Sequence, residues 1–226
     1  NTKYYITEYT TLRAAVEHSD KESLTTGFAD LTTMTIPVAF YYDIDKSLSA
    51  GVGYRSRSSK VGNQVTSAKF DSDDDAFFVG IENKVSDIWS YELEVGTQER
   101  NFDASEIADQ DGLFASLLVN FQISDMTELV SELSNEFGTT LANQSTETVS
   151  VGVQLNHTFD ERLSASLGFS SAKIEYTQDN GARDDDRYSS FLTVDYKLMD
   201  GQWTLRGSFS HDNSNSTVDS ATYQAL

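Results

Sequence analysis

Three runs rich in acidic residues are the clearest candidates for ion chemistry in this chain. They lie at residues 71–75, 103–111 and 184–186. Carboxylate oxygens are ligands that calcium prefers, so a calcium site is one interpretation of these runs. The glycine and glutamate pattern of a calcium-binding helix–loop–helix is missing, and runs of like charge usually lie on a hydrated surface. We therefore expect solvated acidic loops and assign no metal site.

No other residue pattern indicates catalysis or a cofactor. His18, His157 and His211 lack the spacing of a metal site, and no glycine motif frames a serine as a nucleophile. The chain has no cysteine, which argues against thiolate chemistry, and its net charge of −20 argues against nucleic acid as a partner. We expect no enzyme activity, no catalytic residue and no cofactor.

The elements that carry the polar residues are strands with a two-residue period. In residues 148–156 every odd position is apolar and every even position is polar or glycine, and residues 163–170 alternate in the same way. Such a strand has one apolar face and one polar face. The alternation lasts for roughly 9–11 residues, which suits a tilted strand crossing a bilayer and exceeds the roughly 5–6 residues of soluble strands. Only a closed barrel satisfies every backbone group of such strands in lipid.

Short polar links alternate with longer polar segments along the chain. The short links lie at residues 43–46, 83–87, 124–126, 160–162 and 200–202, about 39 residues apart. The longer segments lie at residues 57–74, 98–110, 138–147, 177–186 and 212–219. This alternation is typical of outer-membrane barrels, whose periplasmic turns are short and whose extracellular loops are longer. The sequence predicts an all-β, antiparallel up-and-down transmembrane β-barrel with periplasmic short turns, in the outer membrane of a Gram-negative bacterium.

At least 12 strands are expected in a single domain, residues 1–226. They lie near residues 3–18, 27–42, 47–58, 75–82, 88–97, 112–122, 127–137, 148–159, 163–176, 187–198 and 203–211, and a twelfth begins at 221. That last strand stops at Leu226 without the terminal aromatic residue that usually completes a bacterial barrel. We expect the sequence to be incomplete at its C-terminus, and whether it is also incomplete at its N-terminus, Asn1, stays open.

Aromatic residues near the expected strand ends predict two interfacial belts, because amphipathic rings prefer the headgroup zone. The alternative is that they fill the core of a soluble sandwich. The aromatic residues near the short turns are Trp89, Trp203, Tyr41, Tyr42, Phe121, Phe159 and Tyr196, and those near the other ends are Tyr54, Phe137, Phe169 and Tyr188.

The polar face of the strands carries the candidate site residues. Hydroxyl and amide side chains dominate this face, and such groups could pass a sugar polymer along by exchanging hydrogen bonds. Any barrel wider than about eight strands, however, has a hydrated or plugged interior with the same lining, so alternation does not distinguish the two cases. The charged residues expected to line the lumen are Arg13, Arg55, Glu92, Glu94, Glu132, Asp195, Lys197 and Arg206.

Three segments resemble repeats of the putative beta-barrel porin-2 family: residues 42–55, 98–103 and 184–189. That family consists of outer-membrane barrels associated with exopolysaccharide and capsule biosynthesis. The resemblance implies a channel or barrel component in exopolysaccharide export. It also implies outer-membrane lipid and lipopolysaccharide as surroundings, a polysaccharide substrate and periplasmic partner proteins. A general diffusion porin or a structural barrel is the alternative, and an outer-membrane enzyme is the least favoured class.

Overall fold

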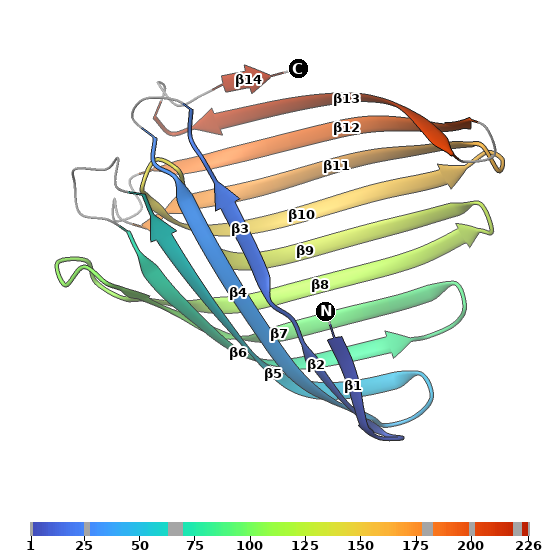
Figure 1. Ribbon diagram of the computed structural model, residues 1–226, viewed down its shortest axis with the longest axis horizontal. Helices are drawn as coiled ribbons and strands as arrows, with labels where there is room; N and C mark the ends of the chain where they lie inside the picture. Colours follow the sequence, from blue (N-terminus) through green and yellow to red (C-terminus); the bar gives the residue numbers. More distant parts are fainter. Residues whose placement is uncertain are drawn as a thin grey trace.

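The computed structural model describes residues 2–24, 28–62, 70–177, 183–198, 202–218 and 223–225. They form one antiparallel sheet of fourteen strands, which curls until the N-terminal strands cross in front of the middle ones (Figure 1). The strands are β1 (Thr2–Thr7), β2 (Thr10–Ala14), β3 (Glu17–Lys21), β4 (Leu31–Asp43), β5 (Leu48–Val61), β6 (Ser72–Lys84), β7 (Trp89–Phe102), β8 (Gln110–Ser124), β9 (Thr127–Thr139), β10 (Ser145–Thr158), β11 (Leu163–Tyr176), β12 (Asp184–Leu198), β13 (Trp203–Ser216) and β14 (Tyr223–Ala225).

From β4 onward, each strand pairs with the strand that follows it, so the up-and-down antiparallel topology is confirmed. The single strand predicted over residues 3–18 is wrong. β1 and β2 form a hairpin whose turn is supported by the Thr7 hydroxyl, which accepts a hydrogen bond from the backbone of Tyr9 at 3.2 Å. β2 and β3 then pair with different parts of β4.

Short and long links lie at opposite ends of the sheet, as the sequence predicts (Figure 1). In two short turns an aspartate accepts hydrogen bonds from the backbone two residues on: Asp45 from Ser47 and Asp160 from Arg162, each at 2.7 Å. These backbone hydrogen bonds stabilise the ionised form and lower the pKa of both carboxyls below its ordinary value. The fifth predicted turn, residues 200–202, lies largely outside the described residues.

Strands β4 to β13 are 13 to 15 residues long, longer than the roughly 9–11 residues over which the alternation persists, and most of them are longer than their predicted ranges. The extra residues lie at the long-link end, where β5 runs on to Val61 and β12 begins at Asp184. Polar residues therefore continue the backbone ladder beyond the apolar part of each strand. The loops at this end are correspondingly shorter than predicted.

The two faces of the sheet differ in polarity. Large apolar side chains such as Val151, which is 47% exposed, cover the convex face, and a buried cluster containing Tyr41, Phe78 and Phe114 lies on the concave face. Two residues predicted for the aromatic belts, Tyr41 and Phe137, are instead buried. Adjacent residues of a strand point to opposite faces, so Tyr41 and Tyr42 cannot both face lipid.

The sheet is not closed: among the described residues no backbone ladder joins β13 or β14 to β1, β2 or β3. The prediction of a closed barrel is therefore not met within this part of the chain. No helix in the described ranges is long and apolar enough to cross a membrane.

Candidate functional site

The charged residues that the sequence assigns to the lumen share one face of the sheet. In an antiparallel ladder directly opposite residues point the same way, and the register can be followed from Arg13 on β2 to Arg206 on β13. This is the concave face, because its side chains meet across strands that are not neighbours. Their role as lumen lining stays a prediction.

Four of these eight residues surround one cavity of about 390 Å³. Arg13 makes two hydrogen bonds to Glu82 of β6, one of them at 2.5 Å, and its guanidinium lies 4.5 Å from the ring centre of Tyr41. The Tyr41 hydroxyl donates to Glu94 of β7 at 3.2 Å. The four predicted residues at the cavity are Arg13, Arg55, Glu92 and Glu94.

The other four predicted residues lie elsewhere on the same face. Asp195 and Arg206 form an ion pair at 2.7 Å between β12 and β13. Lys197 follows on β12, nearer the turn, and Glu132 lies on β9. The structure therefore divides the predicted set between the cavity and the far side of the sheet.

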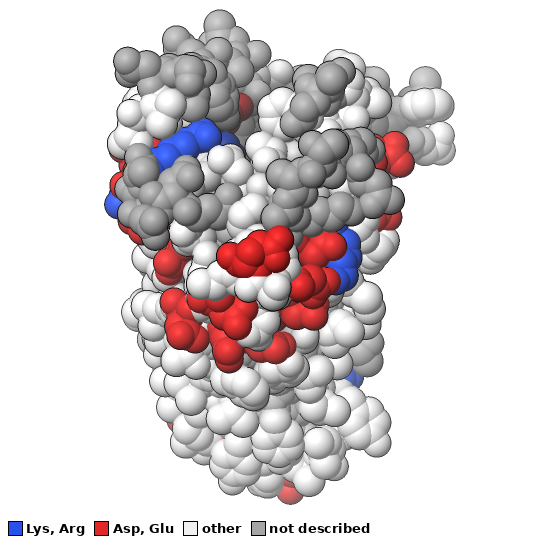
Figure 2. All heavy atoms as spheres, turned by 90° about the vertical axis from the view of Figure 1, so that its left-hand side faces the viewer, with Lys and Arg blue, Asp and Glu red and all other residues white. Residues whose placement is uncertain are grey.

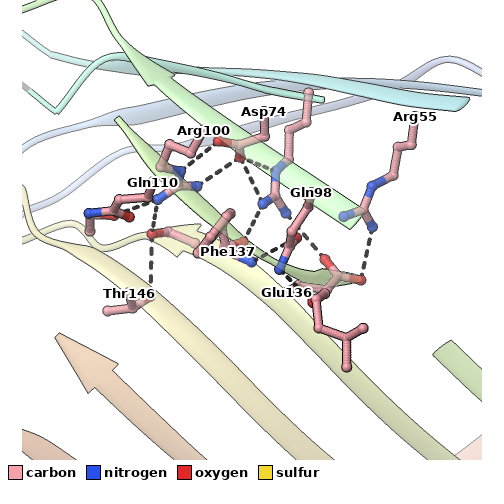
Figure 3. Close-up of polar contacts among 12 residues, drawn as sticks. Arg55, Asp74, Gln98, Arg100, Gln110, Glu136, Phe137 and Thr146 are labelled. Atoms are coloured by element: carbon pink, nitrogen blue, oxygen red, sulfur yellow. Dashed lines mark hydrogen bonds and ion pairs between the residues drawn. The ribbon is translucent and has the colours of Figure 1, made fainter. Parts of the chain in front are cut away.

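Sequence reasoning missed a group of buried charges on this face, which Figure 3 shows. Arg100 of β7 is fully buried, and it donates to both carboxylate oxygens of Asp74 of β6, at 2.5 and 2.7 Å. Arg57 of β5 donates to the same carboxylate at 2.8 Å. Asp74 thus holds two guanidinium groups from the strands on either side of it.

The same arginines reach the opposite part of the curled sheet. Arg100 donates to the backbone carbonyl of Gly138 at 2.6 Å, and Arg57 donates to the carbonyl of Phe137. Glu136 of β9 pairs with Arg55 at 3.0 Å and with Arg57 at 3.2 Å. Since β6, β7 and β8 separate β5 from β9 in the sheet, the contacts of Arg55 and Arg57 with β9 span its interior.

The expectation that the acidic runs are simply solvated is wrong for two of their members. Asp74 is the middle residue of Asp73-Asp74-Asp75, and Asp185 is the middle residue of a second triplet, residues 184–186. Both are buried, and Asp185 accepts a hydrogen bond from the Tyr176 hydroxyl at 2.8 Å. These runs belong to strands, so alternation turns the middle carboxylate inward.

Other acidic side chains of this end remain exposed. Figure 2, which looks at the end with the long links, shows them gathered on its surface. Exposed members at this end include Asp73, Glu99, Asp103, Asp109 and Asp111.

Strands β8 to β13 bring mostly uncharged polar side chains to the concave face. Ser134 and Ser150 hydrogen-bond at 2.8 Å, and Asn156 accepts from Gln154 at 2.7 Å and from Ser166 at 2.8 Å. We call this surface the hydroxyl wall; it comprises Ser116, Ser134, Ser150, Gln154, Asn156, Ser166 and Ser170, and a hollow of about 400 Å³ lies against part of it. The sequence signal for this wall was the polar half of the alternating pattern.

Comparisons with known proteins agree with this architecture. A family model described as Putative beta-barrel porin 2 matches residues 50–226. No match was found among curated proteins.

Similar solved structures are outer-membrane barrels at low identity. The FrpB iron transporter of Neisseria meningitidis is 12% identical with a TM-score of 0.51, and the alignment covers 92% of this chain but only 40% of that one. A FadL homologue of Pseudomonas aeruginosa is 13% identical with a TM-score of 0.48, covering 94% of this chain and 68% of the homologue. These likenesses concern the fold. The family match itself points to an outer-membrane barrel.

Proposed function

The chain belongs to the Putative beta-barrel porin 2 family, and from this premise we propose that it is an outer-membrane channel through which an exopolysaccharide leaves the cell. The concave face of the sheet is the wall of the pathway. Outer-membrane lipid and lipopolysaccharide surround the convex face, and periplasmic proteins deliver the polymer. The proposal assigns no catalytic step and no cofactor to the chain.

The observation that carries the proposal is the hydroxyl wall. Its serine and amide side chains offer both donors and acceptors, as the hydroxyl groups of a sugar do. Many weak and equivalent sites let a polymer bind and still move on, whereas a few strong sites would hold it. A wall made mainly of hydroxyl and amide side chains, with Glu132 among them, therefore suits the passage of a carbohydrate chain.

A general diffusion porin is the second candidate, and the other side of the concave face favours it. There Arg13, Arg55, Glu92 and Glu94 place both signs of charge at one cavity. A lining of mixed charge is compatible with many small solutes and singles out no polymer.

Deletion of the gene separates the two functions. If the chain exports polysaccharide, deletion should remove the polymer from the cell surface, and the gene supplied in trans should restore it. Surface polymer that is unchanged in the deletion strain, together with free entry of small sugars into liposomes carrying the purified protein, would overturn the export proposal in favour of the porin.

The hydroxyl wall can be tested in the complemented strain. Ser134→Ala combined with Ser150→Ala removes a pair of hydroxyl groups from the wall with little change in volume, and we expect less surface polymer at equal protein level. Thr97→Ala is the matched control, because Thr97 is an exposed residue of β7 on the convex face. An equal loss in the control would remove the support for the wall.

A further inference from the structure

The ion pairs of Glu136 cross the concave face of the sheet. Glu136 lies on β9, and its two partners, Arg55 and Arg57, lie on β5. We propose that these three residues, which we call the latch, close the interior at the long-link end, and that passage through the channel requires the latch to open. This inference rests on the channel function proposed above.

The latch is attached to a frame that does not depend on it. Asp74 stands directly opposite Arg57 on one side and Arg100 on the other, and it pairs with both. If Glu136 swings away, Arg57 keeps its carboxylate partner. Arg55 keeps its position 4.5 Å from the ring centre of Phe114. Opening the latch therefore leaves Arg57 with a carboxylate partner, while Arg55 gives up its ion pair and keeps its contact with Phe114.

Glu136 is the accessible member of the group. Its side chain is 35% exposed, whereas those of Arg55 and Arg57 are each 14% exposed. Water can replace its ion pairs at a modest cost, since the strength of an ion pair falls as its exposure rises. Arg57 also donates to the Phe137 carbonyl of β9, so opening breaks this hydrogen bond together with the two ion pairs of Glu136, while Arg57 stays paired with Asp74.

The position of the latch gives this movement a consequence for passage. Arg55 and Glu136 both line the cavity that holds Glu92 and Glu94. Glu92 and Glu94, both on β7, lie nearer the short turns than the latch does. Release of Glu136 and of the Phe137 carbonyl from the β5 arginines would join this cavity to the long-link end of the molecule.

The test uses the absence of cysteine from residues 1–226, because one introduced cysteine is then the only thiol among them, and labelling is read on this protein alone. Asn120→Cys places it on the concave side of β8, nearer the short turns than the latch. A bulky, charged thiol reagent is added to intact cells, and the rate of labelling is measured. We expect slow labelling with Glu136 present, and labelling severalfold faster in Glu136→Gln.

Two further variants separate the latch from other causes. Glu136→Asp keeps the charge but shortens the reach, so it should also accelerate labelling. Glu99→Gln removes an exposed carboxylate at the same end of the sheet but on the convex face of β7, and it should change the rate much less. Heat-modifiability on a gel shows that each variant has folded.

Unchanged labelling in both Glu136 variants would overturn the latch, and so would equal acceleration in Glu99→Gln. Labelling needs no polysaccharide. A deletion strain with normal surface polymer, combined with fast labelling in the Glu136 variants, would therefore reject the export function and leave the latch standing.

Discussion

Asp74 is the residue on which the buried charges of the concave face depend. Asp74→Asn keeps the shape of the side chain but removes the charge that Arg57 and Arg100 share. Loss of one partner from a buried ion pair typically costs about 3–5 kcal/mol, and we expect a loss of that size in the free energy of unfolding. Urea titration of the refolded protein in lipid measures it. Asp73→Asn, at the exposed neighbouring position, should change the free energy by less than about 0.5 kcal/mol, and equal losses would contradict the assignment.

Glycines of the concave face make room for aromatic rings. A Cβ atom built on Gly53 would overlap the ring of Phe78, and one on Gly51 would lie 2.8 Å from the ring of Tyr41. Overpacking of this kind costs about 1–3 kcal/mol, so Gly53→Ala should lower the free energy of unfolding by that amount. Gly207→Ala is the control, because nothing lies within 4 Å of its added Cβ. The same urea titration measures both variants. An unchanged free energy of unfolding in Gly53→Ala would show that the ring of Phe78 is free to move.

Single residues were the part of the site hardest to predict from the sequence. The alternation of polar and apolar residues placed Arg13 and Glu94 on the inner face. It could not show that Arg13 of β2 pairs with Glu82 of β6. Arg57 and Arg100 were missed because they lie where loops were expected. Pairing between distant strands depends on the curvature of the sheet, which no local pattern in the sequence records.

Among the elements, strands with a strong two-residue period were predicted well. The bounds of β11, Leu163–Tyr176, match the prediction, and β9 and β10 differ from it only near their ends. The N-terminal region failed because residues 3–18 lack a continuous alternation, and its hairpin turn rests on hydroxyl contacts of Thr7 that composition does not reveal. The prediction of the strand ends near the long links failed because polar strands and polar loops have similar amino-acid compositions.

The facing of β10 gives a prediction at the scale of one strand. Val151 is on the convex face, and Gln154 is on the concave face, where it donates to Asn156. Arginine on the lipid face near the midplane costs roughly 2–4 kcal/mol, whereas an inward arginine can stay hydrated. Val151→Arg should therefore impair assembly much more than Gln154→Arg in a heat-modifiability assay. Similar effects of the two substitutions would count against this register.

For the whole molecule, the curl of the sheet turns an alternating sequence into two unlike inner surfaces. The charged cavity lies against β1, β2 and β4–β9, and the hydroxyl wall covers β8 to β11. The latch joins the two parts by linking β5 to β9. The sequence predicted one polar face, but the division of that face follows from which strands meet across the interior.

The orientation of the molecule in the membrane is the last prediction. Short turns with an aspartate at their centre lie at one end, and the long links with exposed acidic residues lie at the other (Figures 1 and 2). In outer-membrane barrels the short turns face the periplasm. An epitope inserted after Glu106, in the link between β7 and β8, should therefore bind antibody on intact cells. An epitope after Glu161, in the turn between β10 and β11, should bind only after the outer membrane is permeabilised. Labelling of the second site alone on intact cells would invert the orientation and move the latch to the periplasmic end.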